Sequence, residues 1–300
     1  MAGKFLRQIR HIFEALMAIL MLLIFRLIGF RVASHLAGII TRLIGKRHKA
    51  HRIAYGNMLR AMPEVGEIER VKLLDKMWMS LGRIIGEYVY ICKMSKKSLA
   101  KRTLVTKETV ENVKRMRERS NDKKSPKGGI IFSGHIGNWD VGLRYLMLEG
   151  VKVNAFYRPL SNGYVDKIMS TFRQYKPIAK GRNGLKDIIS AIKRGEYVII
   201  MADQKVTDGE PVKFFHEDAK TTTSIARIAL KYDVEIVSAR GYRTDDGLGF
   251  KFEAGRPLEI ERSGNLNKDV LKITKTINET LEEWIRQVPS QWFWVHNRWK

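Results

Sequence analysis

From residue 128 onward, the chain alternates short apolar segments with segments of helical periodicity. Strand-like segments cover 130–132, 151–157, 197–202, 234–242 and 250–254, and helical patterns cover 141–148, 163–175, 185–194, 225–231 and 269–287. This alternation favours an α/β fold with a mixed, largely parallel sheet flanked by helices. With 300 residues, 44% of them hydrophobic, the chain can bury a substantial core.

The first of these strands leads into a glycine-rich turn, within the stretch GGIIFSGHIGNWD at 128–140. His135 lies in the turn, and Asp140 follows five positions later. On one regular helix, five residues would place their side chains about 140° apart. Gly137 permits a bend, so we expect a strand, a turn and a helix that begins near Asn138.

Asp140 would then lie in the first turn of that helix. There it can accept a hydrogen bond from one imidazole nitrogen of His135 and leave the other nitrogen as a base. A simpler interpretation is that Asp140 is only a favourable charge at a helix N-terminus and that His135 is a loop residue.

Polar residues also follow two other strands. Arg158-Pro159 comes after 151–157, and Asp203-Gln204 comes after 197–202. In open α/β sheets, ligands bind at the carboxyl ends of the strands. Pro159 restricts Arg158 to an extended conformation, so its guanidinium can be aimed at a phosphate or at Asp203. A purely structural ion pair between Arg158 and Asp203 is the alternative.

The N-terminal region contains the uncharged apolar run ALMAILMLLIF at 15–25. This run is short for a membrane span, but the segment 12–30 reaches spanning length if Arg26 extends its charge to the interface. Basic residues flank both sides, and the positive-inside rule favours a cytoplasmic position for each flank. We expect either one span or a shallow helix that enters and leaves the same leaflet. A buried core helix is the third interpretation.

Two further segments have two interpretations each. Residues 31–46 have apolar residues at helical spacing and are followed by the basic cluster KRHKAHR at 46–52. They form either an interfacial helix with a lipid-facing basic patch or an amphipathic helix packed on the body. The aromatic residues near the C-terminus also have two interpretations. They either lie at a membrane interface or pack against the last helix and close the hydrophobic core. They are Trp292, Phe293, Trp294 and Trp299.

The charge balance requires an anionic partner. Lys and Arg total 55 against 31 Asp and Glu, which gives a formal net charge of +24. Nucleic acid, an anionic membrane surface, an acidic protein or a phosphorylated substrate would fit. The basic residues of 95–127 are mixed with acidic ones and form no known nucleic-acid-binding pattern, which favours a solvated surface.

The single cysteine, Cys92, excludes an intrachain disulfide, and its apolar neighbours favour a packed thiol over a nucleophile.

Five segments together resemble a known family. They are GHIGNWD at 134–140, FYRPLSN at 156–162, MADQ at 201–204, VKFFHEDAKTTTSIARIAL at 212–230 and PSQWFWVHNRWK at 289–300. The chain resembles the lysophospholipid acyltransferase-like superfamily, whose signature is a His, four residues and then Asp or Glu. Within it, the chain is most similar to the lipid A biosynthesis late acyltransferases, the lauroyl and myristoyl transferases of Gram-negative inner membranes.

The resemblance implies a glycerolipid acyltransferase-like fold and transfer of a fatty acyl chain from acyl carrier protein to a hydroxyl of a Kdo-bearing lipid A precursor. His135 would deprotonate that hydroxyl, and Asp140 would orient His135. Backbone N–H groups of the 136–138 turn would help stabilise the oxyanion. The residues expected to bind substrate are Arg158, Asp203, Gln204 and Asn138.

The same resemblance implies that no metal and no organic cofactor is required. The expected partners are acyl carrier protein, a phosphorylated lipid A precursor and anionic membrane lipid, with no nucleic acid. Residues 1–50 would form a membrane anchor with an amphipathic basic segment, and residues 51–300 an acyltransferase domain on the cytoplasmic face of the inner membrane. The alternatives are a lysophospholipid or glycolipid acyltransferase and, from another class, a membrane-tethered nucleic-acid-binding protein.

Overall fold

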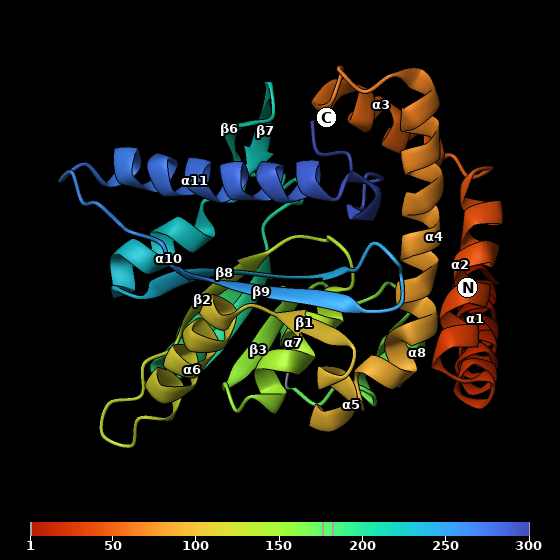
Figure 1. Ribbon diagram of the computed structural model, residues 1–300, viewed down its shortest axis with the longest axis horizontal. Helices are drawn as coiled ribbons and strands as arrows, with labels where there is room; N and C mark the ends of the chain where they lie inside the picture. Colours follow the sequence, from red (N-terminus) through yellow and green to blue (C-terminus); the bar gives the residue numbers. More distant parts are fainter. Residues whose placement is uncertain (1, 176, 182, 300) are drawn as a thin grey trace.

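A seven-stranded sheet forms the centre of the molecule in the computed structural model, which describes residues 2–175, 177–181 and 183–299 (Figure 1). Its strands, in spatial order, are β1 (Thr103–Val105), β9 (Phe250–Pro257), β8 (Glu235–Arg243), β2 (Gly129–Ser133), β5 (Tyr197–Met201), β3 (Val153–Tyr157) and β4 (Ile178–Ala179). Five of the neighbouring pairs are parallel, and β8 and β9 are antiparallel. This confirms the predicted α/β fold with a mixed, largely parallel sheet.

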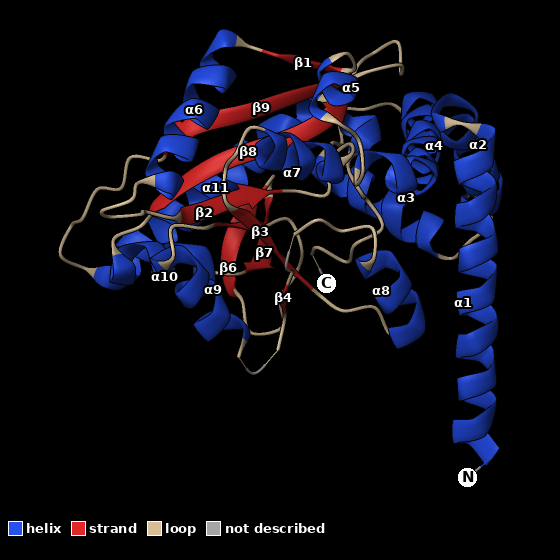
Figure 2. Ribbon diagram, turned by 90° about the horizontal axis from the view of Figure 1, so that it is seen from below, coloured by secondary structure: helices blue, strands red, loops and turns tan. Residues whose placement is uncertain are grey.

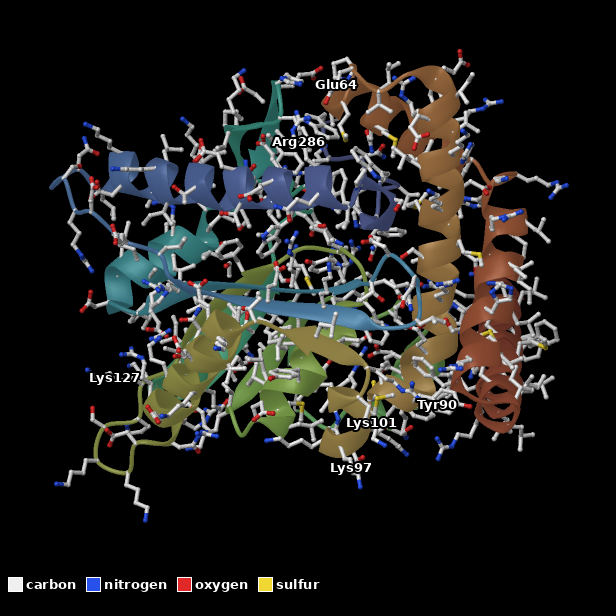
Figure 3. The ribbon with its side chains drawn as sticks, viewed as in Figure 1. Glu64, Tyr90, Lys97, Lys101, Lys127 and Arg286 are labelled. Atoms are coloured by element: carbon white, nitrogen blue, oxygen red, sulfur yellow. The ribbon has the colours of Figure 1, made fainter. Side chains whose placement is uncertain are left out.

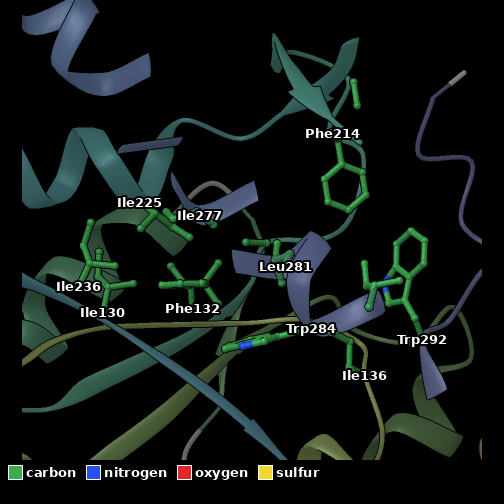
Figure 4. Close-up of a cluster of buried hydrophobic side chains, with 14 of the residues drawn as sticks. Ile130, Phe132, Ile136, Phe214, Ile225, Ile236, Ile277, Leu281, Trp284 and Trp292 are labelled. Atoms are coloured by element: carbon green, nitrogen blue, oxygen red, sulfur yellow. The ribbon is translucent and has the colours of Figure 1, made fainter. Parts of the chain in front are cut away.

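Strand β2 lies at the centre of the sheet, between β8 and β5, and all its residues are buried. Because side chains alternate across a strand, Ile130 and Phe132 pack into one hydrophobic cluster and Ile131 into another (Figure 4). A parallel strand that is covered on both faces needs apolar residues at successive positions. The Ile-Ile-Phe run before the turn meets that need.

Helices cover both faces of the sheet. Residues of α9 (Gly184–Lys193), α10 (Ser224–Tyr232) and α11 (Leu266–Gln287) belong to the cluster on one face, and those of α6 (Lys107–Asn121) and α7 (Trp139–Leu148) to the cluster on the other. In Figure 1, α10 and α11 lie above the sheet and α6 and α7 below it. Shorter helices are α5 (Lys96–Ala100), α8 (Gly163–Ser170) and the 3-10 helix η1 (Pro289–Gln291).

The strands that sequence patterns did not reveal are β1, β4 and the separate antiparallel hairpin of β6 (Glu210–Phe214) and β7 (Glu217–Thr221). The hairpin buries only two residues on each strand, and the rest of its sequence is mostly charged. It therefore lacks a strong apolar alternation. The predicted helix over 163–175 is shorter than expected, because α8 ends at Ser170.

The N-terminal helices form a layer at one end of the sheet. They are α1 (Ala2–Ile28), α2 (Phe30–Gly45), α3 (Ala50–Ala61) and α4 (Glu67–Ile91). Gly29, with φ of 85°, separates α1 from α2. The segment predicted at 31–46 packs on the body, because glycines let α2 approach α4 closely. A Cβ at Gly82 would lie 2.2 Å from the Ala37 carbonyl oxygen.

Helix α1 is not a core helix. It lies along the edge of the body and projects past it (Figure 2). It is long and apolar enough to cross a membrane, with a mean hydropathy of 2.2 in its most apolar window, of which 17% is buried. Large apolar side chains such as Phe13 and Leu27 are exposed around it. Such a surface is consistent with membrane association.

The C-terminal segment closes the core. Trp292 and Trp294 are fully buried, and Trp292 packs near Phe214 of β6 (Figure 4). Arg298 is also fully buried, and its guanidinium donates to the Lys220 carbonyl oxygen at 2.8 Å. At the surface, Arg286 of α11 and Glu64 form an ion pair of 2.6 Å (Figure 3). For Trp292 and Trp294, the interpretation as core residues is therefore confirmed.

Candidate active site

His135 lies in the turn between β2 and α7. Gly137 has φ of 60°, and a Cβ there would lie 2.4 Å from the Cα of Tyr242, so no other residue fits. The C-terminal segment holds the turn, because the Phe293 N–H donates to the His135 carbonyl oxygen at 3.0 Å and the Gly137 N–H donates to the Gln291 carbonyl oxygen at 2.9 Å.

Two of the backbone donors of this turn are engaged within the fold. Besides the bond from Gly137, the Ile136 N–H donates to the Gly134 carbonyl oxygen at 2.8 Å. Of the three N–H groups expected to help stabilise an oxyanion, that of Asn138 has no hydrogen-bond acceptor among the described residues. Its role as an oxyanion donor stays a prediction.

The carboxylate that contacts the His135 ring is Asp203, where sequence spacing suggested Asp140. His135 Nδ1 lies 2.8 Å from Asp203 Oδ1, and the His135 backbone N–H donates to Oδ2 at 2.7 Å. Trp292 Nε1 also donates to Oδ2 at 2.8 Å. Within the described residues, no hydrogen bond joins His135 to Asp140.

The register of the sheet explains this contact. Strands β2 and β5 are parallel neighbours, with Ser133 opposite Met201. His135 and Asp203 each lie two residues beyond that pair, so the two side chains leave the sheet at the same level.

Asp203 remains ionised although it is fully buried. Burial alone would raise its pKa, but the hydrogen bonds from His135 and Trp292, and the positive charges that His135 and His296 carry when they are protonated, hold the pKa well below its usual range. A carboxylate accepts a hydrogen bond, so Nδ1 of His135 carries the proton. The lone pair of a neutral His135 is therefore on Nε2.

Asp140 also lines the cavity, but it contributes charge without a hydrogen bond to the imidazole. Burial raises its pKa to about 6, and the nearby charges of Arg173 and His135 partly oppose that rise. Its backbone N–H donates to Asn138 Oδ1 at 3.2 Å, so Asn138 caps α7. The amide of Asn138 donates to Glu87 at 2.8 Å. Asn138 is thus turned into the protein and is absent from the described residues that line the cavity.

Arg158 and Gln204 lie at the cavity in different ways. Arg158 is exposed at the rim while Asp203 is fully buried, and the described part of the chain shows no ion pair between them. Their expected pairing is therefore corrected, because His135 and Trp292 occupy the carboxylate. Gln204 Nε2 lies 3.4 Å from His135 Nε2 and 3.3 Å from Nε2 of His296.

Sequence analysis assigned no role to two residues of the site, although one of them, His296, lies in the segment 289–300 that contributes to the family resemblance. The ring of His296 lies 5.2 Å from that of His135, and burial lowers the pKa of His296 to about 4, so it is neutral at pH 7. Arg173 lines the cavity near Asp140, and its Nη1 has no hydrogen-bond partner among the described residues. Both come from segments distant in sequence from His135, so only folding brings them together.

The cavity has a volume of about 1240 Å³ and combines polar and apolar walls. One apolar region lies under the sheet, another lies beside α1, and the polar rim follows the strand ends. The region under the sheet includes Ile131, Leu143, Leu146, Ile199 and Phe252. The rim includes the exposed cations Arg158, Lys180 and Lys205.

Among the described residues, His135, Asp203 and His296 form a group that could hold a metal ion, since one donor atom from each lies within 4.8 Å of the others. However, both oxygens of Asp203 already accept hydrogen bonds from His135 and Trp292. The Gln204 amide also lies within 3.4 Å of both imidazoles. The group is therefore arranged as a hydrogen-bonded acid-base site.

Comparison with known proteins identifies relatives that are named as acyltransferases. The chain is 26% identical to a lipid A biosynthesis acyltransferase of Haemophilus influenzae, over 93% of this chain and 85% of that protein. It is also 26% identical to the lipid A biosynthesis lauroyltransferase of Escherichia coli, over 90% of this chain and 85% of that protein, and 24% identical to the palmitoleoyltransferase of the same organism, over 88% and 82%.

A solved structure with similarity is the 1-acyl-sn-glycerophosphate acyltransferase PlsC from Thermotoga maritima. The match has a TM-score of 0.34 and 14% identity, and it covers 80% of this chain and 98% of that chain. The family of bacterial lipid A biosynthesis acyltransferases matches residues 2–300. Since that match covers nearly the whole chain, the protein belongs to the bacterial lipid A biosynthesis acyltransferase family.

Proposed function

We propose that this protein transfers a fatty acyl chain from acyl carrier protein to a hydroxyl of a hydroxyacyl chain on a phosphorylated, Kdo-bearing lipid A precursor. Residues 1–50 would attach the catalytic body, residues 51–300, to the cytoplasmic face of the bacterial inner membrane. The observation that carries the proposal is the contact of 2.8 Å between His135 Nδ1 and Asp203, which leaves Nε2 as a base in a large, mainly apolar cavity.

The reaction begins at Nε2 of His135. This nitrogen takes the proton of the acceptor hydroxyl while the oxygen attacks the thioester carbonyl carbon. The resulting imidazolium keeps its hydrogen bond to Asp203 and is near the carboxylate of Asp140, so both negative charges stabilise it. When the tetrahedral intermediate collapses, the C–S bond breaks, and the imidazolium returns its proton to the departing thiolate. An ester and a free carrier thiol are the products.

Three other residues assist. Nη1 of Arg173, which has no hydrogen-bond partner among the described residues, would stabilise the oxyanion together with the N–H of Asn138. Gln204 contacts Nε2 of His135 until the acceptor hydroxyl replaces it. At the rim, Arg158 binds anionic groups of the precursor or of the acidic carrier. The apolar region under the sheet takes the donor's acyl chain.

The test is acyl transfer by purified protein in lipid vesicles, followed by mass spectrometry of the lipid that gains a chain. We expect His135→Ala to lower the rate about 100-fold to 10,000-fold, the usual effect of losing a general base. Asp203→Asn should cause a loss on the order of 1,000-fold, because an amide can donate to Nδ1 and move the imidazole proton onto Nε2.

The control is His216→Ala, which removes an exposed histidine of the β6–β7 turn and should leave the rate unchanged. An unchanged rate in His135→Ala would contradict the mechanism. A chain gained only by lysophospholipid or by another glycolipid would identify the alternative acceptor instead.

A further inference from the structure

One face of α1 is turned toward the protein. Ala15, Leu22 and Phe25 are at most 7% exposed, and Ala18 lies on the same face, at the helical spacing of three and four residues. Over the uncharged stretch 15–25, the rest of the helix circumference is apolar and mostly exposed, as at Leu20, which is 50% exposed. Helix α1 therefore has one face on the catalytic body and the others available to lipid.

Two sets of hydrogen bonds hold α1 in this position. Asn162, the N-cap of α8, donates to the His11 carbonyl oxygen at 2.9 Å and to Glu14 at 2.8 Å. Farther along α1, the hydroxyl of Tyr90 donates to the Phe25 carbonyl oxygen at 2.6 Å. Tyr90 is labelled in Figure 3, near the end of α4. These contacts fix α1 on the body at two points, on either side of the stretch 18–22 that lines the cavity.

Between these two contacts, α1 forms part of the cavity that contains His135. Ala18, Met21 and Leu22 line it from α1, Ile84 and Tyr88 line it from α4, and Met169 lines it from α8. The polar group of this set, the Tyr88 hydroxyl, donates to the Met169 carbonyl oxygen. This side of the cavity is therefore suited to a hydrocarbon chain, and it is adjacent to a helix whose other faces suit a bilayer.

Resting on the function proposed above, we propose that the α1 side of the cavity is a lateral portal. Through it, a hydroxyacyl chain of the acceptor lipid reaches His135 while the rest of the lipid stays in the bilayer. The acceptor is the lipid that must come from the membrane. The acidic carrier protein that delivers the donor is soluble and is attracted to the exposed cations of the rim, Arg158, Lys180 and Lys205.

The small side chain of Ala18 then leaves room for the acyl chain of the acceptor lipid to pass through the portal. Ala18→Phe narrows the portal without adding charge or polarity to α1. Leu20→Phe is the matched control, because it adds an aromatic ring on an exposed face of the same helix. Steady-state kinetics with the precursor in vesicles would give kcat and KM for the acceptor. Hydrolysis of the donor thioester without acceptor would show whether the catalytic centre of each variant is intact.

We expect Ala18→Phe to lower kcat/KM for the acceptor about tenfold or more, and Leu20→Phe to match wild type. Donor hydrolysis should be unchanged in Leu20→Phe, and in Ala18→Phe it should fall much less than transfer to the acceptor. Equal acceptor kinetics for the two variants, or an equal fall of donor hydrolysis and transfer in Ala18→Phe, would overturn the portal and leave the proposed function intact. Absence of transfer by wild type to any lipid acceptor would instead refute the proposed function together with the portal.

Discussion

At the scale of single residues, the two carboxylates near His135 have different roles. Asp203 is ionised and bonded to Nδ1, so it fixes the tautomer of the base. Asp140 has a pKa of about 6, because burial opposes its charge. Sequence spacing singled out His135 and Asp140 as a pair, but a shared motif does not imply a shared hydrogen bond. Which carboxylate touches the ring depends on the neighbouring strand.

Asp140 leads to a prediction about pH. Its native pKa of about 6 lies above the ordinary value of 3.8, so the native state holds this proton more tightly than the unfolded chain. The bound proton therefore stabilises the native state. This contribution to the free energy of unfolding is fully present below pH 3.8 and is lost as the pH rises through 6. Asn has no proton to lose. Relative to wild type, Asp140→Asn should therefore gain about 1–3 kcal/mol of stability as the pH rises from 4 to 7.

Thermal unfolding of both proteins in detergent at pH 4.5, 5.5 and 7 would measure this difference. Asp187→Asn, on the exposed surface of α9, is the control and should show no such trend. A melting-temperature difference between Asp140→Asn and wild type that stays constant with pH would contradict the prediction.

At the scale of elements, a buried ionic cluster joins the N-terminal helices to the catalytic turn. Glu87 of α4 is fully buried. Its carboxylate accepts hydrogen bonds from Ser34 of α2 at 2.6 Å, from Asn138 at the start of α7 at 2.8 Å and from Arg243 of β8 at 2.8 Å. One side chain of α4 thus joins α2, β8 and the start of α7, the helix that follows the His135 turn.

Removal of this carboxylate should be costly. Glu87→Ala leaves the guanidinium of Arg243 buried without its partner, so we expect a loss of about 3–5 kcal/mol of stability. The control is Glu217→Gln, which breaks an exposed ion pair of 3.0 Å with Arg60 and should change stability by about 1 kcal/mol or less. Chemical denaturation in detergent would compare the two, and equal losses would show that the cluster contributes no more than a surface pair.

At the scale of the whole molecule, the net charge of +24 matches the partners of the proposed function: an anionic leaflet, a phosphorylated lipid and an acidic carrier. Attraction between exposed charges weakens as salt shortens the Debye length from about 10 Å at 0.1 M to about 3 Å at 1 M. We therefore expect KM for acyl carrier protein to rise about tenfold between 0.05 M and 0.5 M salt. KM for an uncharged acyl-thioester donor should stay unchanged, and an equal rise for both donors would exclude electrostatic attraction of the carrier.

The local sequence determined much of this protein. The Ile-Ile-Phe run, the glycine turn and the helix start near Asn138 follow from hydrophobic periodicity and backbone freedom, which depend on neighbouring residues. The family resemblance also came from contiguous segments. The buried thiol of Cys92, whose pKa burial raises to about 12, agrees with the packed residue expected from its apolar neighbours.

Tertiary structure alone decided the contacts of the base. The pairing of β2 with β5 placed Asp203 beside His135, and the C-terminal segment brought His296 and Trp292 to the same site. The packing of α1 on α8 made the proposed membrane anchor one wall of the cavity as well. Strand register and helix packing depend on residues far apart in the chain. Hydrophobic periodicity and motif spacing are local, so they could not predict either one.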